Sequence, residues 1–135
     1  MDELRITLRS APTDCWSCGA ETIIISSIHL RAANDEAECS VSDFTDHPAL
    51  IQDLSPSIAG LDNMGEIKPR FSKTLAQPYM SNGCAHCDAL FGQHFELMTR
   101  YDEHDAAHLE VPASGQWADF LRKLLSSEDG HLFHF

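Results

Sequence analysis

The two Cys-x-x-Cys pairs are the feature that most restricts how this chain can fold. Cys15 and Cys18 form the first pair, Cys84 and Cys87 form the second, and 65 residues lie between the pairs. Zinc binds four ligands in a tetrahedron, and one Cys-x-x-Cys turn supplies two adjacent thiolates. Because the cost of loop closure grows only logarithmically with length, the long separation is compatible with one shared site. The spacing therefore predicts a single structural zinc ion held by all four cysteines.

Three other interpretations of these cysteines compete with a zinc site. Iron in a rubredoxin-like centre uses the same four thiolates, and the spacing does not distinguish the two metals. A redox dithiol usually stands at a helix amino terminus, whereas Cys18 is followed by a β-branched run over residues 22–28. The cysteines can also be small buried side chains without a ligand. We expect the fifth cysteine, Cys39, to be such a small buried or neutral residue; a reactive thiol or exchange into the metal site is the alternative.

The charge balance narrows the choice of partners. The 135 residues contain 9 Lys and Arg against 21 Asp and Glu, a formal net charge of −12 with histidine neutral. Because affinity for a phosphate backbone comes largely from Lys and Arg displacing counterions, this balance argues against nucleic acid and favours a basic protein partner. Eight of the acids lie in residues 32–66, a stretch without Lys or Arg. These eight are Asp35, Glu36, Glu38, Asp43, Asp46, Asp53, Asp62 and Glu66.

Length and hydropathy favour one folded domain over residues 1–135. A chain of this size supports one hydrophobic core, and its 43% hydrophobic content is too high for a disordered acidic tail. No run of about 18 apolar residues is present, so no membrane span is expected. The first five residues carry neither a basic leader nor an apolar stretch. No signal peptide is therefore expected, and the cytoplasm is the predicted compartment.

Hydrophobic periodicity predicts an α+β protein in which strands flank both cysteine pairs. Alternation over residues 4–9 and the β-branched run over residues 22–28 predict two strands joined by the first pair. Residues 75–80 predict an edge strand, because Pro78 has no N–H to donate to a neighbour. Residues 94–97 alternate again and predict a strand after the second pair.

The acidic stretch is expected to form an insertion of about residues 31–66 that carries a helix. Pro48 is placed in the first turn of this helix, and the apolar residues that follow it share one face. Ser55 and Pro56 are expected to end the helix, because proline removes a backbone donor. Residues 101–109, which are mostly polar, are also predicted to be helical.

The clearest predicted helix is carboxyl-terminal and spans about residues 114–127. Ser114 is a suitable cap, and apolar residues recur at i, i+3, i+4, i+7 and i+8. These expected core residues are Trp117, Phe120, Leu121, Leu124 and Leu125. Beyond Gly130, the aromatic tail ending in Phe133, His134 and Phe135 is expected either to pack on the core or to contact a partner or a second copy.

The residues around the cysteine pairs carry a resemblance. Trp16 lies inside the first pair, and the segment around the second pair contains Tyr79, Asn82, Ala89 and Gly92. This combination resembles a group of short bacterial zinc-ribbon proteins, which share an early Cys-Trp-x-Cys and a later Asn-x-Cys-x-x-Cys-x-Ala-x-x-Gly. The resemblance implies a zinc ribbon with Cys15, Cys18, Cys84 and Cys87 as ligands and no catalytic residue. Asp88 stands where such turns often carry glycine, which predicts a less tight second turn.

Histidines at two places in the sequence are possible metal ligands. His104 and His108 are spaced i, i+4, similar to H-E-x-x-H with Asp105 in place of the glutamate. A solvated polar face is the favoured interpretation, and a second metal site is the alternative; Asp is too short a base for protease chemistry. His86, between the second pair of cysteines, is expected to point outward.

The basic residues Lys68, Arg70 and Lys73 surround Phe71, a mixture that single-strand nucleic-acid sites also use. Against the net acidic charge, we favour charge balance with the acidic insertion.

Together these features predict an α+β protein built on a zinc ribbon of two Cys-x-x-Cys hairpins, with an acidic helix-containing insertion and a carboxyl-terminal amphipathic helix. Because four thiolates fill the zinc shell, the metal is expected to be structural and the protein is not expected to be an enzyme. The favoured function is binding a basic protein, for example as an inhibitor or immunity protein for a toxin or nuclease. The alternative function is a nucleic-acid-binding zinc ribbon or transcription accessory protein.

Overall fold

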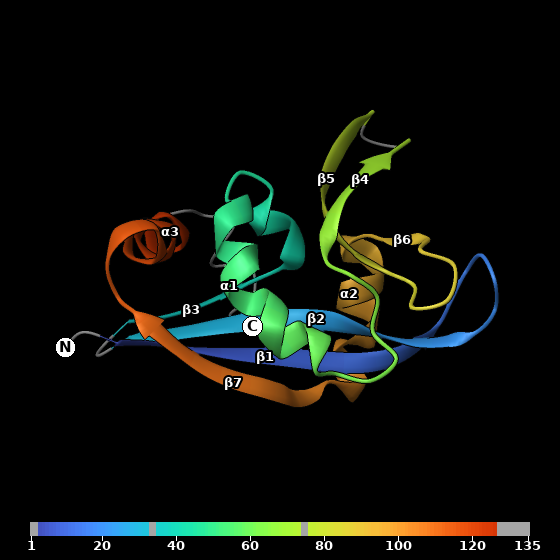
Figure 1. Ribbon diagram of the computed structural model, residues 1–135, viewed down its shortest axis with the longest axis horizontal. Helices are drawn as coiled ribbons and strands as arrows, with labels where there is room; N and C mark the ends of the chain where they lie inside the picture. Colours follow the sequence, from blue (N-terminus) through green and yellow to red (C-terminus); the bar gives the residue numbers. More distant parts are fainter. Residues whose placement is uncertain (1–2, 33–34, 74–75, 127–135) are drawn as a thin grey trace.

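A four-stranded antiparallel sheet forms the centre of the fold (Figure 1). Its strands are β1 (Glu3–Asp14), β2 (Glu21–Ala32), β3 (Asp35–Cys39) and β7 (His104–Pro112), in the order β3-β2-β1-β7. The computed structural model describes residues 3–32, 35–73 and 76–126, so the aromatic tail discussed above lies outside the described residues. The strands predicted over residues 4–9 and 22–28 are confirmed, and both are longer because β1 and β2 pair from Arg5 to Asp14.

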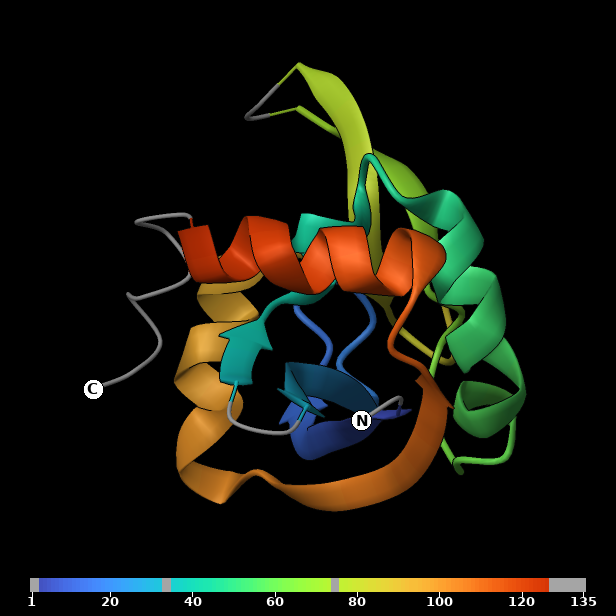
Figure 2. The ribbon, with the colours of Figure 1, turned by 90° about the vertical axis from the view of Figure 1, so that its left-hand side faces the viewer.

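One face of this sheet carries the hydrophobic core. Alternation along β1 turns Leu4, Ile6 and Leu8 to this face, where all three are fully buried. The 3-10 helix η1 (Val41–Phe44) and the helices α1 (Pro48–Ala59) and α3 (Gly115–Ser126) lie over the sheet (Figure 2) and contribute further residues to the core cluster, together with β2 and β3. The predicted carboxyl-terminal helix is confirmed, because Trp117 and Phe120 of α3 pack against Phe44.

The acidic insertion carries a helix, as expected, but this helix is longer than predicted. The prediction that Ser55 and Pro56 end α1 is wrong, because the helix continues to Ala59 with Pro56 inside it. Buried Ile58 holds the last turn against the core, and the Ser55 hydroxyl donates to the carbonyl of Ile51. These contacts offset the backbone hydrogen bond that Pro56 cannot make.

A second antiparallel sheet holds the second cysteine pair. It contains β4 (Lys68–Ser72), β5 (Gln77–Gly83) and β6 (Leu90–Phe91), in the order β4-β5-β6. The strand expected over residues 75–80 corresponds to β5. Pro78 pairs only with Phe71 of β4, because β6 reaches no further than Asn82 and Gly83. Pro78 therefore occupies an edge position, where the missing N–H costs no ladder hydrogen bond.

Two predicted elements have the wrong type. Residues 94–97 belong to the helix α2 (Gln93–Thr99), not to a strand. Four alternating residues do not separate a strand from a helix, and the buried residues Glu96 and Thr99 follow helical spacing instead. Residues 104–109, predicted as helix, lie in β7 and follow the 3-10 helix η2 (Arg100–Asp102). Pairing with β1 determines this strand.

The longest described helices have 12 residues. Within the described ranges, none of the helices combines the length and the apolar character that crossing a membrane requires.

Candidate metal centre

The turn between β1 and β2 places the first two sulfur atoms. The N–H of Gly19 donates to the carbonyl of Cys15 at 2.9 Å, and the N–H of Cys15 donates to the carbonyl of Ala20 at 2.8 Å. The backbone N–H groups of Ser17 and Cys18 point at Cys15 Sγ, at 3.3 and 3.4 Å. Gly19 has a φ of 77°, a conformation that glycine adopts without steric cost. The tight turn therefore surrounds one thiol with backbone donors.

The turn between β5 and β6 repeats this arrangement. The N–H of Asp88 donates to the carbonyl of Cys84 at 3.1 Å, and the N–H of Cys84 donates to the carbonyl of Ala89 at 3.0 Å. The N–H of His86 points at Cys84 Sγ at 3.3 Å. Asp88 occupies the position of Gly19 and has a similar φ of 65°. Asp88 thus adopts the glycine conformation, and the same two hydrogen bonds close the second turn.

The two turns face each other and bring the four predicted sulfur atoms together. The distance from Cys15 Sγ to Cys87 Sγ is 3.6 Å, and that from Cys18 Sγ to Cys84 Sγ is 3.7 Å. All four sulfur atoms lie within 4.8 Å of one another. A tetrahedral ion bound at about 2.3 Å separates its sulfur ligands by roughly 3.8 Å. The cluster therefore has the size of a four-thiolate metal site, and this size suits zinc and iron equally.

The four thiols are so close that ionisation of one disfavours ionisation of the others. Burial raises the pKa of Cys15, but the N–H groups of Cys18 and Ser17 and two neighbouring thiols lower this pKa to about 6 overall. The backbone N–H of Ala20 lowers the pKa of Cys18, whereas burial and the other three sulfur atoms raise this pKa to about 11. The cluster therefore disfavours further thiolates unless a cation compensates their charge.

Side chains from each turn also hold the two turns against each other. The indole N–H of Trp16 donates to the carbonyl of Leu90 at 2.8 Å. His86 of the second turn lies with Nε2 at 3.1 Å from the carbonyl oxygen of Glu21. His86 is exposed and is not part of the ligand cluster, in agreement with the prediction that its side chain points outward.

A buried arginine supports the second turn. Arg70 on β4 donates to the Asp88 carboxylate at 2.6 Å and to two backbone carbonyls, and Lys68 Nζ lies 3.0 Å from the same carboxylate. The Arg70 hydrogen bond is the main reason that the pKa of Asp88 lies below its usual value. Gly83 leaves room for this guanidinium, because a Cβ there would lie 2.1 Å from Arg70 Nη2.

The partner predicted for the basic residues was therefore wrong. Lys68 and Arg70 form ion pairs with Asp88 in the second cysteine turn, not with carboxylates of residues 31–66. Toward the insertion, Arg70 donates to the backbone carbonyl of Glu66 at 2.8 Å. Phe71, which follows Arg70, is 63% exposed. Asp88 could have indicated this partner. A charged residue at a turn position that favours glycine is expected to have a compensating contact.

Exchanging Asp88 for Asn is expected to lower the free energy of unfolding by about 1 kcal/mol. Asn tolerates the left-handed conformation, but it leaves the buried Arg70 guanidinium without its carboxylate partner. Because the Asp88 side chain is partly exposed, the loss of stability is small. The difference should shrink at acid pH, as the pH falls through the lowered pKa of Asp88 and the native carboxylate is protonated. Urea denaturation of both proteins measures this effect, and Asp62→Asn is the exposed control. An Asp88→Asn protein as stable as the control would contradict the role of the Arg70 contact.

The remaining cysteine lies apart from the cluster. Cys39 on β3 is fully buried in the main core, as the small buried residue that was expected. Burial, and after it the charges of Asp43 and Glu96, raise the pKa of the Cys39 thiol well above its usual value. Cys39 is therefore neither a ligand of the four-sulfur cluster nor a readily ionised thiol.

The histidine pair is not the helical ligand pair of the sequence motif. His104 and His108 lie on β7, opposite Ser10 and Thr7 of β1. Three residues of an extended strand separate these positions of β1 by about 10 Å. Within the described residues the two histidines do not come together in one set of metal ligands.

Comparison of the chain with known proteins adds no relative. No protein-family model, no curated protein and no solved structure matches it. The resemblance to short bacterial zinc-ribbon proteins accordingly stays a prediction, and the support for a function comes from the residues themselves.

Proposed function

We propose that this chain is a zinc-ribbon protein that uses a structural zinc ion to hold its fold and an acidic surface to bind a basic protein. Cys15, Cys18, Cys84 and Cys87 would hold the ion, and their separations support this assignment. When bound, zinc would supply a cross-link between the two turns and the positive charge that four thiolates need. With four protein ligands the ion has no open position for a substrate.

The distribution of ion pairs supports the proposed acidic binding surface. Arginines are paired with carboxylates of the same chain: Arg9 with Glu103 and Asp105, Arg100 with Glu38, and Arg122 with Asp119. These pairs compensate the charges of Glu38 in the insertion and of Glu103, Asp105 and Asp119 nearer the carboxyl terminus. Within the described residues, the insertion keeps exposed acids without an ion pair. We call Asp46, Asp62 and Glu66 the acidic patch.

Asp46 of the acidic patch precedes α1, and Asp62 and Glu66 lie in the loop that follows this helix. The charges of the acidic patch are available to a partner, because no arginine or lysine of the described chain neutralises them. Complementary charge raises association rates and selects partners by sign. A basic protein is therefore the partner class that this surface fits, and an inhibitor or immunity protein for a basic toxin or nuclease is the concrete form of the proposal.

Capture experiments with matched baits test the partner class. The zinc-loaded chain, immobilised and incubated with extract of its native cell, is expected to retain a basic protein that elutes with salt. The variant Asp46→Asn, Asp62→Asn, Glu66→Gln should lose this protein. The variant Asp102→Asn, Glu110→Gln, Asp119→Asn has the same change in charge outside the acidic patch and should keep it. Equal capture by both variants would contradict the proposed surface.

Two further measurements separate this function from its alternatives. A nucleic-acid-binding zinc ribbon predicts retention on heparin or DNA at low salt, and such retention would overturn the choice of a basic protein partner. Elemental analysis is expected to find one zinc per chain. One iron per chain, with visible absorption of the thiolate complex, would overturn the choice of metal while leaving the acidic patch untouched.

A further inference from the structure

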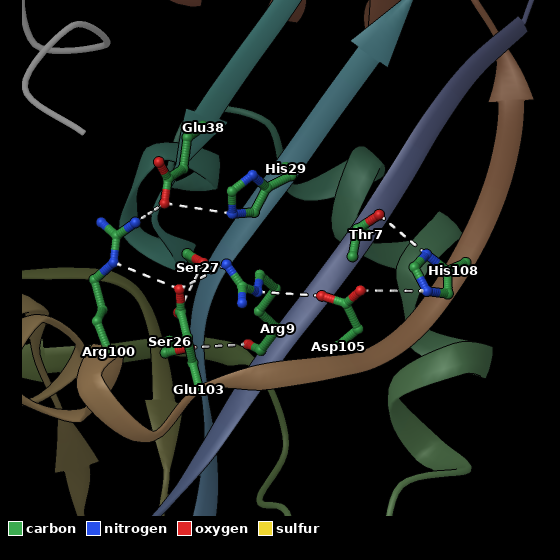
Figure 3. Close-up of polar contacts among 10 residues, drawn as sticks. All are labelled: Thr7, Arg9, Ser26, Ser27, His29, Glu38, Arg100, Glu103, Asp105 and His108. Atoms are coloured by element: carbon green, nitrogen blue, oxygen red, sulfur yellow. Dashed lines mark hydrogen bonds and ion pairs between the residues drawn. The ribbon is translucent and has the colours of Figure 1, made fainter. Parts of the chain in front are cut away.

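The face of the main sheet opposite the core is lined with polar side chains in rows across the strands. Strand register places Glu38, His29, Thr7 and His108 side by side in one row, across β3, β2, β1 and β7. The next row on the same face contains Glu36, Arg31, Arg5 and Glu110. Thr7 is thus flanked by two histidines, and Thr7 Oγ1 lies 3.1 Å from His108 Nδ1 (Figure 3). This face is the second surface on which a function can reside.

Some of the charged side chains on this face form ion pairs with one another. Arg9 Nη1 lies 3.0 Å from the Glu103 carboxylate, and Arg100 contacts the Glu38 carboxylate (Figure 3). His29, Glu38 and Glu103 lie close enough to share a metal ion. However, the two guanidinium groups already compensate both carboxylates, so a dication would meet two positive charges. The arrangement favours an ion-pair network there over a metal site.

The row of Arg5 and Arg31 is different, because two like charges stand directly opposite each other. Arg5 on β1 pairs with Arg31 on β2 in the register of the sheet, an arrangement that destabilises an antiparallel pair. Arg5 has only a 4.0 Å contact with Glu110. Within the described residues Arg31 has no carboxylate within ion-pair distance, although Glu36 is its neighbour across the strands. In the part of the chain that the structure describes, Arg31 thus lacks the ion pair that Arg5, Arg9 and Arg100 each have.

A groove opens at this pair. It has a volume of about 270 Å³, and Arg5, Arg31, Thr7, His29 and His108 line it. Arg9 and the carboxylates of Glu36 and Asp105 complete the lining. Asp105 is held by Arg9, whose Nε lies 3.2 Å from its carboxylate, and lies 3.8 Å from His108 Nε2. Thus Arg5 and Arg31 supply two positive charges to the groove; Glu36 is the only carboxylate of the lining next to Arg31, and Glu110 makes the 4.0 Å contact with Arg5 from the adjoining strand.

We propose that this groove binds a small phosphate monoester, with its dianionic phosphate held between the Arg5 and Arg31 guanidinium groups. Two guanidinium forks match the charge and the oxygen geometry of such a dianion. The Thr7 hydroxyl and the two flanking histidines offer further hydrogen-bonding groups in the next row. The size of the groove restricts the ligand to a compact molecule. A nucleic-acid backbone fits less well, because it extends beyond two arginines onto a protein of net negative charge.

A titration of the zinc-loaded full chain tests this site. Methyl phosphate, which is largely dianionic at pH 7.5, is the probe, and dimethyl phosphate is the matched monoanion. Calorimetry is expected to show saturable binding of methyl phosphate with a Kd below about 1 mM, at least tenfold tighter than dimethyl phosphate. Amide and ring signals of Thr7, His29 and His108 are expected to shift in NMR spectra during the titration. Equal binding of the two esters, or no saturation, would overturn the proposal.

Three variants locate the binding. Arg31→Gln is expected to weaken methyl phosphate binding at least tenfold, whereas Arg122→Gln, on α3, should change it less than twofold. Glu36→Gln should tighten binding, because it removes the opposing carboxylate. Without ligand, Arg31→Gln should melt no lower than the wild type, since it relieves the like-charge pair. Equal losses of methyl phosphate affinity in Arg31→Gln and Arg122→Gln would show that the overall charge of the protein attracts the ligand, and would contradict the proposed site.

A single-stranded oligonucleotide with a 5′-hydroxyl tests the competing polyanion. It is expected to compete with methyl phosphate only weakly. Competition as strong as that of methyl phosphate itself would overturn the assignment to a monoester. Neither result depends on the acidic patch, so the groove and the proposed partner surface can fail separately.

Discussion

Replacing Cys84 with Ser is expected to release the metal and unfold the end of the molecule that carries both cysteine turns. Cys84 is 2% exposed, and it packs with Cys15, Ile24 and Phe91 in a small cluster separate from the main core. This cluster is too small to hold the two turns together by itself. Structural zinc sites in small domains contribute about 10–16 kcal/mol of apparent binding free energy, which is also folding free energy. Loss of one ligand should therefore remove most of the stability of this end.

Metal content and circular dichroism measure this outcome. The wild-type chain should contain one metal ion and lose structure when a chelator removes it, whereas Cys84→Ser should be purified without metal. Cys39→Ala is the matched control: it removes a cysteine from the main core and should keep one metal ion per chain. The double variant His104→Ala, His108→Ala should keep it too. Full metal content in Cys84→Ser would refute the four-thiolate assignment.

The stability of the protein is expected to fall between about pH 4.5 and 8 because of one buried carboxyl group. Glu96 on α2 is 3% exposed and accepts a hydrogen bond of 3.2 Å from the Asn82 amide. Its other oxygen, Oε1, has no hydrogen-bond partner among the described residues. Burial raises the pKa of Glu96 from 4.5 to about 8, against the smaller lowering effects of the Asn82 amide and the Val41 backbone N–H.

The sign of this effect follows from proton binding. Below pH 4.5 the Glu96 carboxyl is protonated in both the folded and the unfolded chain and has no net effect. Between pH 4.5 and 8 the folded chain holds the proton while the unfolded chain releases it, so stability falls as the pH rises. Above pH 8 the loss is complete and amounts to at most about 5 kcal/mol.

Glu96→Gln isolates this contribution from the other titrating groups. Gln stays neutral at every pH and keeps a carbonyl oxygen for the Asn82 amide. The variant should match the wild type near pH 4.5 and exceed its free energy of unfolding by several kcal/mol at pH 8. Urea denaturation across this range measures the difference, with the exposed Glu66→Gln as control. Parallel curves for the wild type and Glu96→Gln would contradict a raised pKa at this position.

The cysteine turns could be predicted because their information is local. Each Cys-x-x-Cys turn depends on a few consecutive residues, and Gly19 supplies the left-handed conformation that the first turn needs. The strands next to the first turn and the face of α3 follow from periodicities of neighbouring residues. What could not be read locally is that the first turn belongs to the four-stranded sheet and the second to the three-stranded sheet.

Where the predictions failed, residues distant in the sequence decided the outcome. Segment 94–97 alternates like a strand, but in the fold it is helical and its Glu96 is buried beside Asn82 of β5. Segment 104–109 is polar enough for an exposed helix, but its backbone pairs with β1, about a hundred residues earlier. Asp88 receives its partner Arg70 from β4 in the same way. Local patterns do not contain these contacts.

The sequence by itself determined the opening feature of the protein, two cysteine pairs able to share one metal ion, together with the excess of acid in residues 32–66. Only the tertiary structure decided which charges remain available to a partner. Cross-strand register sets Arg9 beside Asp105, close to Glu103, and leaves Arg5 opposite Arg31. Composition counts charges, whereas pairing depends on which strands lie side by side. For that reason the acidic patch and the groove at Arg5 and Arg31 both depend on the tertiary structure.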